Sequence, residues 1–108
     1  MLKVGTVYMA TGTYFLNDAT KETLKNLAQE INTTGAKSIL IYGHADSRGG
    51  VDNSLLSQNR AKAVAKYIRP LLTSKNISIG WFSSNKPAKA GNSAAAQALN
   101  RRVEIYTK

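Results

Sequence analysis

The short apolar run KSILIYG (residues 37–43) lies between two longer segments whose apolar residues recur at helical spacing. A brief, nearly continuous apolar run that ends in glycine is typical of a strand buried on both faces, as in a parallel pair joined by a helix. An earlier strand, a helix and this strand imply a right-handed crossover. The run therefore constrains the chain to a fold in which strands alternate with helices that pack on them.

The remaining elements follow from the same two periodicities. Residues 2–8, 77–82 and 101–107 alternate in the manner of strands, and residues 94–99 (AAAQAL) indicate a short helical turn. The sequence thus predicts an α+β fold with the order β-α-β-α-β-(α)-β. Two main helices are expected to pack on a mixed parallel and antiparallel four-stranded sheet. At 108 residues the chain is expected to form one domain, residues 1–108.

The two main helices have recognisable ends. In the first, Asn17 or Asp18 is the expected N-cap and Gly35 the expected C-terminal stop. The second covers residues 54–72. Pro70 lies near its end and predicts a kink or an early stop, because proline removes a backbone hydrogen bond.

The chain is strongly basic, with 15 Lys and Arg against 6 Asp and Glu and a net charge of +9. This balance favours an anionic partner, such as nucleic acid, an anionic lipid face or an acidic polymer. The charges are spread along the chain, however, so a solvated surface explains them as well. The aromatic residues mostly follow strand or helix periodicity, and no RNA-binding strand signature is present, so nucleic acid is not the expected partner.

Targeting and redox signals are sparse. The sequence has no cysteine, which excludes disulfides and thiolate chemistry. No segment approaches the ~20 apolar residues of a membrane span, and the start MLKVGTVYMATG lacks the features of a signal peptide. If the protein works outside the cytoplasm, its targeting segment must lie outside this chain, and we then expect the chain to be a fragment of a longer one.

The stretch GHADSRGGVDNSLLSQNRA (residues 43–61) places an arginine on an apolar helix face. Arg60 lies four residues after Leu56 and four before Val64, so its side chain shares their stripe. Either its stem covers apolar surface while its head reaches water, or its guanidinium is held at the edge of the core. In the second case it faces the strand end at Gly43–Asp46, where ligand sites on parallel sheets tend to lie.

Asp46 and Arg60 can together recognise a zwitterion, since a carboxylate binds an ammonium group and a guanidinium binds a carboxylate. Alternatively, the two pair with each other or cap backbone groups. His44 is the only histidine, and without a cysteine or second histidine it favours no metal site. We expect it to hydrogen-bond the backbone at the strand end. Gly49 and Gly50 are expected to form a tight turn, and Asn53 has the position of an N-cap.

This stretch resembles the peptidoglycan-binding signature of OmpA-like domains, a family that includes Pal lipoproteins and the periplasmic part of MotB stator proteins. The family pattern is GH[TA]D, a glycine, and then N-x-x-L-S-x-x-R-A-x-x-V. The matching positions are Gly43, His44, Ala45, Asp46, Asn53, Leu56, Ser57, Arg60, Ala61 and Val64. LNRRVEI (residues 99–105) resembles the closing motif and VYMATGTYFLNDATKETL (residues 7–24) the opening pattern, so the resemblance covers nearly the whole chain.

The resemblance implies non-catalytic binding of the peptidoglycan stem peptide through the zwitterionic end of its diaminopimelate, with no cofactor and no metal. The implied ligand-binding residues are Asp46, Arg60, Asn53, Leu56, Ala10 and Thr11. The first two would grip the diaminopimelate, the next two would shape the pocket, and the last two would contribute backbone groups. The resemblance also implies a periplasmic location and a membrane tether outside this chain, and it leaves a homodimer open.

The sequence departs from the family pattern at the rim of the pocket. Met9, Ala10 and Thr11 stand where the family often has Phe-Asp-Phe, and Ala96 and Gln97 stand where it often has Gly-Arg. The alternative function is therefore an assembly or dimerisation module of a stator or secretion complex that has lost wall binding. A lytic enzyme is not expected, because no second carboxylate has a recognisable catalytic context.

Overall fold

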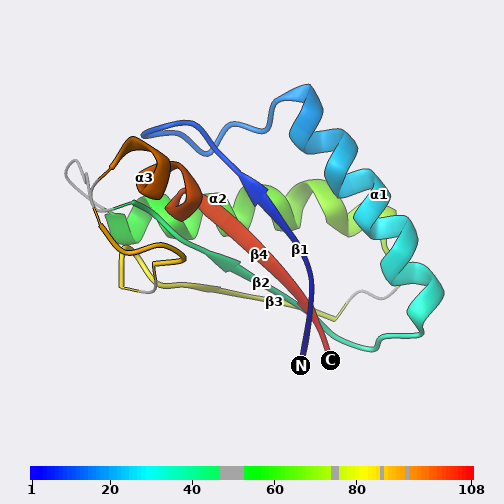
Figure 1. Cartoon of the computed structure of the whole chain (residues 1–108). Helices are drawn as coiled ribbons and strands as arrows, with labels where there is room; N and C mark the ends of the chain where they lie inside the picture. Colours follow the sequence, from blue (N-terminus) through cyan, green and yellow to red (C-terminus); the bar gives the residue numbers. More distant parts are fainter. Residues whose placement is uncertain (47–52, 74–75, 86, 92) are drawn as a thin grey trace.

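The computed structural model describes residues 1–46, 53–73, 76–85, 87–91 and 93–108. Its strands and helices follow the predicted order and confirm the α+β fold (Figure 1). The strands are β1 (Leu2–Tyr8), β2 (Ile39–Gly43), β3 (Ile77–Trp81) and β4 (Arg102–Thr107). The helices are α1 (Asp18–Thr34), α2 (Asn53–Ile68), the 3-10 helix η1 (Arg69–Leu71) and α3 (Ala94–Asn100).

The four strands form one mixed sheet in the order β1-β4-β2-β3. Strands β2 and β3 are parallel and are connected through α2, whereas β4 runs antiparallel to both β1 and β2. The expected pairing of the first two strands across α1 is wrong, because β4 lies between β1 and β2. The paired parallel strands are β2 and β3. Because β1, β2 and β3 share one direction, their carboxyl ends meet the start of β4 at one end of the sheet (Figure 1).

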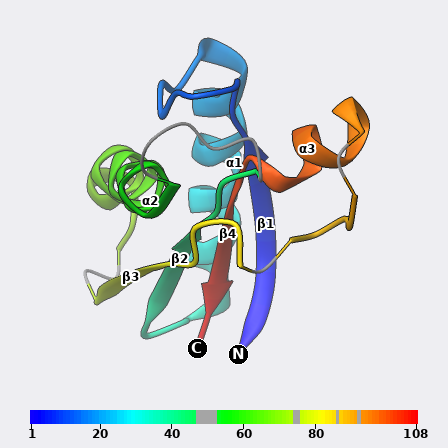
Figure 2. The ribbon, with the colours of Figure 1, turned by 90° about the vertical axis from the view of Figure 1, so that its left-hand side faces the viewer.

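Helices α1 and α2 pack on the same face of the sheet (Figure 2). Their apolar stripes, which include Leu24 and Val64, meet Ile41 and Ile105 in a core where all four side chains are completely buried. Burial of an apolar side chain of this size stabilises the fold by about 1.5–3 kcal/mol. The shared core therefore fixes both helices, and with them the loops at the end of the sheet.

The expectation that the KSILIYG strand is buried on both faces is wrong. Buried and half-buried residues alternate along β2, and Ile41 points into the core while Tyr42 is only half-buried. The reason is topological, because α1 and α2 occupy the same face of the sheet. On the other face the Tyr42 ring packs 5.4 Å from the Phe82 ring and 5.5 Å from the Tyr106 ring, measured between centroids.

Three of the predicted helix-end signals appear in the structure. The Asn17 side chain accepts a hydrogen bond from the backbone N–H of Thr20 at 2.8 Å, and this caps α1. Gly35 ends α1 with a φ of 72°, a left-handed conformation that favours glycine. Helix α2 ends at Ile68 and tightens into η1, which contains Pro70, so the early stop is confirmed.

Candidate functional site

The sheet end at which β1, β2 and β3 finish brings four distant segments together. These segments are the loop after β1, the loop after β2, the first half of α2 and the junction of α3 with β4 (Figure 1). The backbone N–H of Met9 donates to the carbonyl of Arg101, and that of His44 donates to the carbonyl of Arg102, both at 2.9 Å. These bonds extend the sheet past β1 and β2 and hold both loops against the start of β4.

Arg60 connects three of these segments. Its side chain is completely buried. Its Nε donates to the carbonyl of Thr13 at 2.9 Å, its Nη1 to that of His44 at 2.9 Å and its Nη2 to that of Ala10 at 3.1 Å. The guanidinium is therefore held inside, facing the end of β2, and it does not reach water as a surface arginine does.

Arg60 remains positively charged although its side chain is buried. Desolvation lowers the pKa of Arg60 from 12.5 to about 10, an effect that Asp46 opposes and Arg101 reinforces. A group with this pKa remains protonated at neutral pH. The site therefore holds a permanent buried cation whose hydrogen bonds go to neutral backbone carbonyls.

Asp46 lies beside a second arginine. Its carboxylate is 6% exposed, and Oδ2 lies 3.3 Å from Nη1 of Arg101. Nε of Arg101 donates to the carbonyl of Met9 at 2.9 Å, so the guanidinium bridges the loop after β1 and the loop after β2. Among the described residues, the charged groups at this site are the carboxylate of Asp46 and the guanidiniums of Arg60 and Arg101.

The structure brings four of the six predicted ligand-binding residues together. Ala10 accepts from Arg60, and Nδ2 of Asn53 donates to the backbone oxygen of Asp46 at 3.3 Å. Asn53 is the first residue of α2 and not its cap, and its side chain ties the start of the helix to the loop after β2. Of the remaining two, Thr11 is exposed in the loop after β1, and Leu56 is half-buried on α2. The predicted turn at residues 49–50 lies outside the described residues.

Arg101 is the residue of this site that the sequence reasoning missed. It belongs to the NRRVE motif, in which the sequence pattern assigns no residue to the site. This motif contains two adjacent arginines with different partners: Arg101 contacts Asp46, whereas Nε of Arg102 donates to Glu104 at 3.0 Å. Because both arginines lie at the start of the last strand, one of them can be expected near the end of the sheet. The sequence spacing alone does not say which of the two faces Asp46.

His44 does not have its expected role. Its ring is buried and stacks on Phe82, with 5.2 Å between the ring centroids. Within the described residues neither ring nitrogen has a hydrogen-bond partner, although Nε2 lies 3.4 Å from Oε1 of Glu104. Burial, reinforced by Arg102 and opposed by Glu104, lowers the pKa of His44 from 6.5 to about 4. The imidazole is therefore neutral at neutral pH, and its backbone carbonyl, not its ring, takes part in the site.

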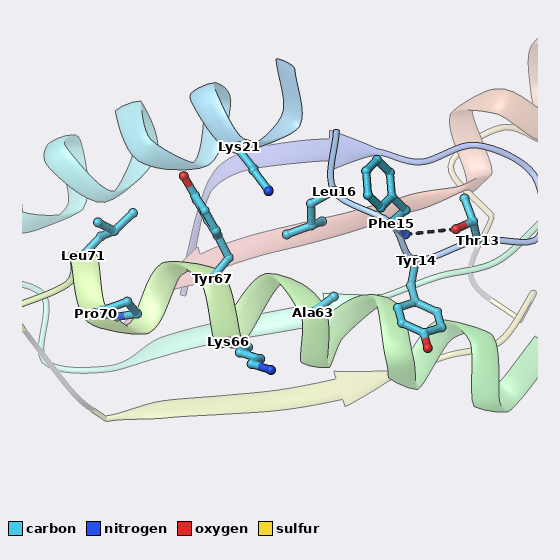
Figure 3. Close-up of a pocket in the computed structure, with 10 residues that line it drawn as sticks. All are labelled: Thr13, Tyr14, Phe15, Leu16, Lys21, Ala63, Lys66, Tyr67, Pro70 and Leu71. Carbon is cyan, nitrogen blue, oxygen red and sulfur yellow. Dashed lines mark hydrogen bonds between the residues drawn. The ribbon is translucent and has the colours of Figure 1, made fainter. Parts of the chain in front are cut away.

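A large groove lies beside the site but does not contain its charged residues. It has a volume of about 840 Å³ and runs between the loop after β1 and α2 (Figure 3). Leu16 and Tyr67 are among its apolar walls, and Lys21 and Lys66 are its charged residues. Among its described lining residues, Thr13 links the groove to the site, because the carbonyl of Thr13 accepts from Arg60.

Two further observations concern the described part of the chain. Among these residues no group of three or more His, Cys, Asp or Glu side chains is placed to hold a metal ion. None of the helices described here is long and apolar enough to cross a membrane.

The comparisons with known proteins agree on one family. A family model described as the OmpA family matches residues 8–101. The peptidoglycan-associated lipoprotein of Buchnera aphidicola subsp. Baizongia pistaciae is 33% identical over 107 residues, a match that covers 96% of this chain and 62% of that protein. This chain thus spans less than two thirds of that relative's length.

Solved structures give the same result for the fold. The crystal structure of the peptidoglycan-associated lipoprotein from Burkholderia pseudomallei superposes with a TM-score of 0.84 at 28% identity, covering 95% of this chain and 89% of that one. The cell wall anchor of the T6SS from Pseudomonas aeruginosa superposes with a TM-score of 0.81 at 26% identity, covering 93% and 76%. The strand order and the helices are therefore those of a fold already seen in these proteins.

Proposed function

Because this chain belongs to the OmpA family, we propose that it is a non-catalytic module that binds peptidoglycan and anchors an envelope protein or complex to the bacterial cell wall. The similar proteins described as peptidoglycan-associated lipoproteins and as a cell wall anchor support this proposal. The observation that carries it is the pair of opposite charges at the sheet end. Asp46 and Arg60 are both buried there, on segments that hydrogen bonds tie together.

The proposed ligand is the diaminopimelate of the stem peptide, whose side chain ends in a zwitterion. The Asp46 carboxylate would accept hydrogen bonds from its ammonium group. A guanidinium carries five N–H donors, and Arg60 gives three hydrogen bonds to backbone carbonyls. The remaining donors of Arg60 would bind the carboxylate of the ligand, in the planar geometry that arginine favours.

The other predicted residues would shape the pocket. Asn53 fixes the backbone of Asp46 through its amide, and we propose that this sets the direction of the carboxylate. Leu56 lies one turn before Arg60 on α2 and would form an apolar wall. Ala10 and Thr11 would contribute backbone groups from the loop after β1.

We further propose that residues 1–108 form one module of a longer, membrane-tethered or secreted protein that works in the periplasm. The greater length of the Buchnera relative supports a longer parent chain. In this arrangement the tether would lie outside these residues, and the module would hold the parent protein at the wall.

Co-sedimentation with purified sacculi tests the proposed function. The wild-type domain should pellet with the wall, whereas Asp46→Asn should bind at least ~30-fold more weakly, because a desolvated charged contact is worth about 2–5 kcal/mol. Asp18→Asn makes the same charge change at an exposed position of α1 and should bind like the wild type. Thermal melting of each variant establishes that it is folded.

Two outcomes would contradict the proposal. Equal binding of sacculi by the wild type and a folded Asp46→Asn variant would show that Asp46 is not part of the binding site. Failure of the folded wild type to bind sacculi would remove the anchoring function and would favour the alternative assembly module.

A further inference from the structure

Arg101 presents the more accessible of the two guanidiniums at the sheet end. Its side chain is 15% exposed, whereas that of Arg60 is completely buried. Nε and Nη1 of Arg101 are held by the carbonyl of Met9 and the carboxylate of Asp46. Within the described residues Nη2 has no partner, so a rigidly held donor remains for a ligand.

A second groove begins at this guanidinium. It has a volume of about 570 Å³ and lies between the end of β1 and α3. Its lining residues are Tyr8, Met9, Ala95, Ala98, Leu99 and Arg101. Apolar side chains therefore form all of its walls except for the single charge of Arg101 at one end, and Tyr8 and Leu99 are 50% and 44% exposed at its rim.

Among the described residues, the charged groups of the site favour an anion. Asp46 carries one negative charge, and the two guanidiniums of Arg60 and Arg101 carry two positive charges, so these three groups sum to one positive charge. A ligand that neutralises them brings one more carboxylate than ammonium. A guanidinium fixed by two acceptors is well suited to that carboxylate, because its geometry is already set before the ligand arrives.

From this geometry we propose that Arg101 and the groove between β1 and α3 form a subsite for a free peptide carboxyl terminus that carries a small apolar side chain. This inference rests on the proposed function and extends it, because the subsite continues directly from Asp46. The occupant is the segment of the stem peptide that follows the gripped diaminopimelate. Its carboxylate lies at Nη2 of Arg101, and its methyl group lies against Ala98 and Leu99.

A pair of peptides that differ only at the carboxyl terminus tests the subsite. The ligands are the diaminopimelate tetrapeptide that ends in D-alanine and the same peptide as its C-terminal amide, titrated by calorimetry into the folded domain. The acid should bind about tenfold more tightly than the amide, the effect expected of one charged hydrogen bond. Arg101→Gln should abolish this preference, and Arg69→Gln, which makes the same charge change at an exposed position of η1, should keep it.

A second variant covers the case in which Arg101→Gln does not fold. Ala98→Leu fills the groove from α3 and should weaken binding of the tetrapeptide acid, whereas Ala94→Leu on the exposed start of α3 should not. Equal binding of acid and amide by the wild type overturns the subsite and leaves the proposed function standing. Absence of binding by both peptides overturns the proposed function and the subsite with it.

Discussion

At the scale of single residues, the guanidinium of Arg60 joins the carbonyls of Ala10, Thr13 and His44. Arg60→Ala leaves these buried carbonyls without a donor and opens a cavity, so we expect the free energy of unfolding to fall by about 3–5 kcal/mol. Urea unfolding followed by circular dichroism measures this loss. The control is Lys62→Ala on the exposed face of the same helix, which should change stability by no more than about 0.5 kcal/mol. A decrease in the free energy of unfolding of less than about 1 kcal/mol in Arg60→Ala would contradict this stabilising role of the Arg60 hydrogen bonds.

His44 predicts a specific dependence of stability on pH. Its pKa is about 4 in the folded chain against 6.5 for a free imidazole, so between these values the unfolded chain binds a proton that the folded chain does not. The stabilisation is therefore complete above pH 6.5 and is lost as the pH falls toward 4, by about 2–3 kcal/mol. Denaturant unfolding at several pH values should show this loss in the wild type. His44→Leu should lack it, and an unchanged pH profile in that variant would assign the loss to other groups.

The sequence predicted Asp46 and Arg60 because their positions depend on local spacing. Leu56 and Val64 define one face of a helix, and helical spacing places Arg60 on that face independently of any contact with distant parts of the chain. The facing direction of Arg101 depends on the register of β4, and a shift of one residue would exchange it with Arg102. That register is set by pairing with two strands far away in sequence, which is why Arg101 could not be chosen from the motif.

At the scale of elements, Gly43 sets how closely α2 approaches β2. A Cβ added there would collide with the backbone oxygen of Ser57 on α2, which cannot rotate away. Gly43→Ala should therefore lower the free energy of unfolding by about 3 kcal/mol. Gly80→Ala is the comparison, because its Cβ would meet only the Tyr42 ring, at 2.8 Å, and a side chain can move. Thermal melting should show that Gly43→Ala is less stable than Gly80→Ala. A Gly80→Ala variant that is the less stable of the two would contradict this expectation.

The elements themselves were predictable, but their neighbours in the sheet were not. Helical spacing, the Asn17 cap, the Gly35 stop and the Pro70 break are local signals, and each appears in the structure. The insertion of β4 between β1 and β2 is a property of the whole sheet. For the same reason β2 was wrongly expected to be buried on both faces, since its run of apolar residues does not reveal that both main helices share one face.

At the scale of the whole molecule, the net charge of +9 bears on how the chain would approach the wall under the proposed function. Peptidoglycan carries carboxylates, so long-range attraction should raise the association rate, and salt should screen it. Stopped-flow association with soluble wall fragments should slow by about tenfold or more from low to high salt. The requirement for Asp46 should persist at every salt concentration. A rate that does not depend on salt would show that the basic surface has no part in the encounter.

Binding of diaminopimelate at Asp46 and Arg60 is tested by titrating the isotope-labelled domain with a diaminopimelate-containing stem peptide and following the backbone amide shifts. We expect saturable shifts at Asp46, Asn53 and Arg60 that vanish in a folded Asp46→Ala variant. Well-folded wild-type protein that shows no shifts at millimolar peptide would contradict it, and the likeness to the OmpA family would then extend to the fold alone.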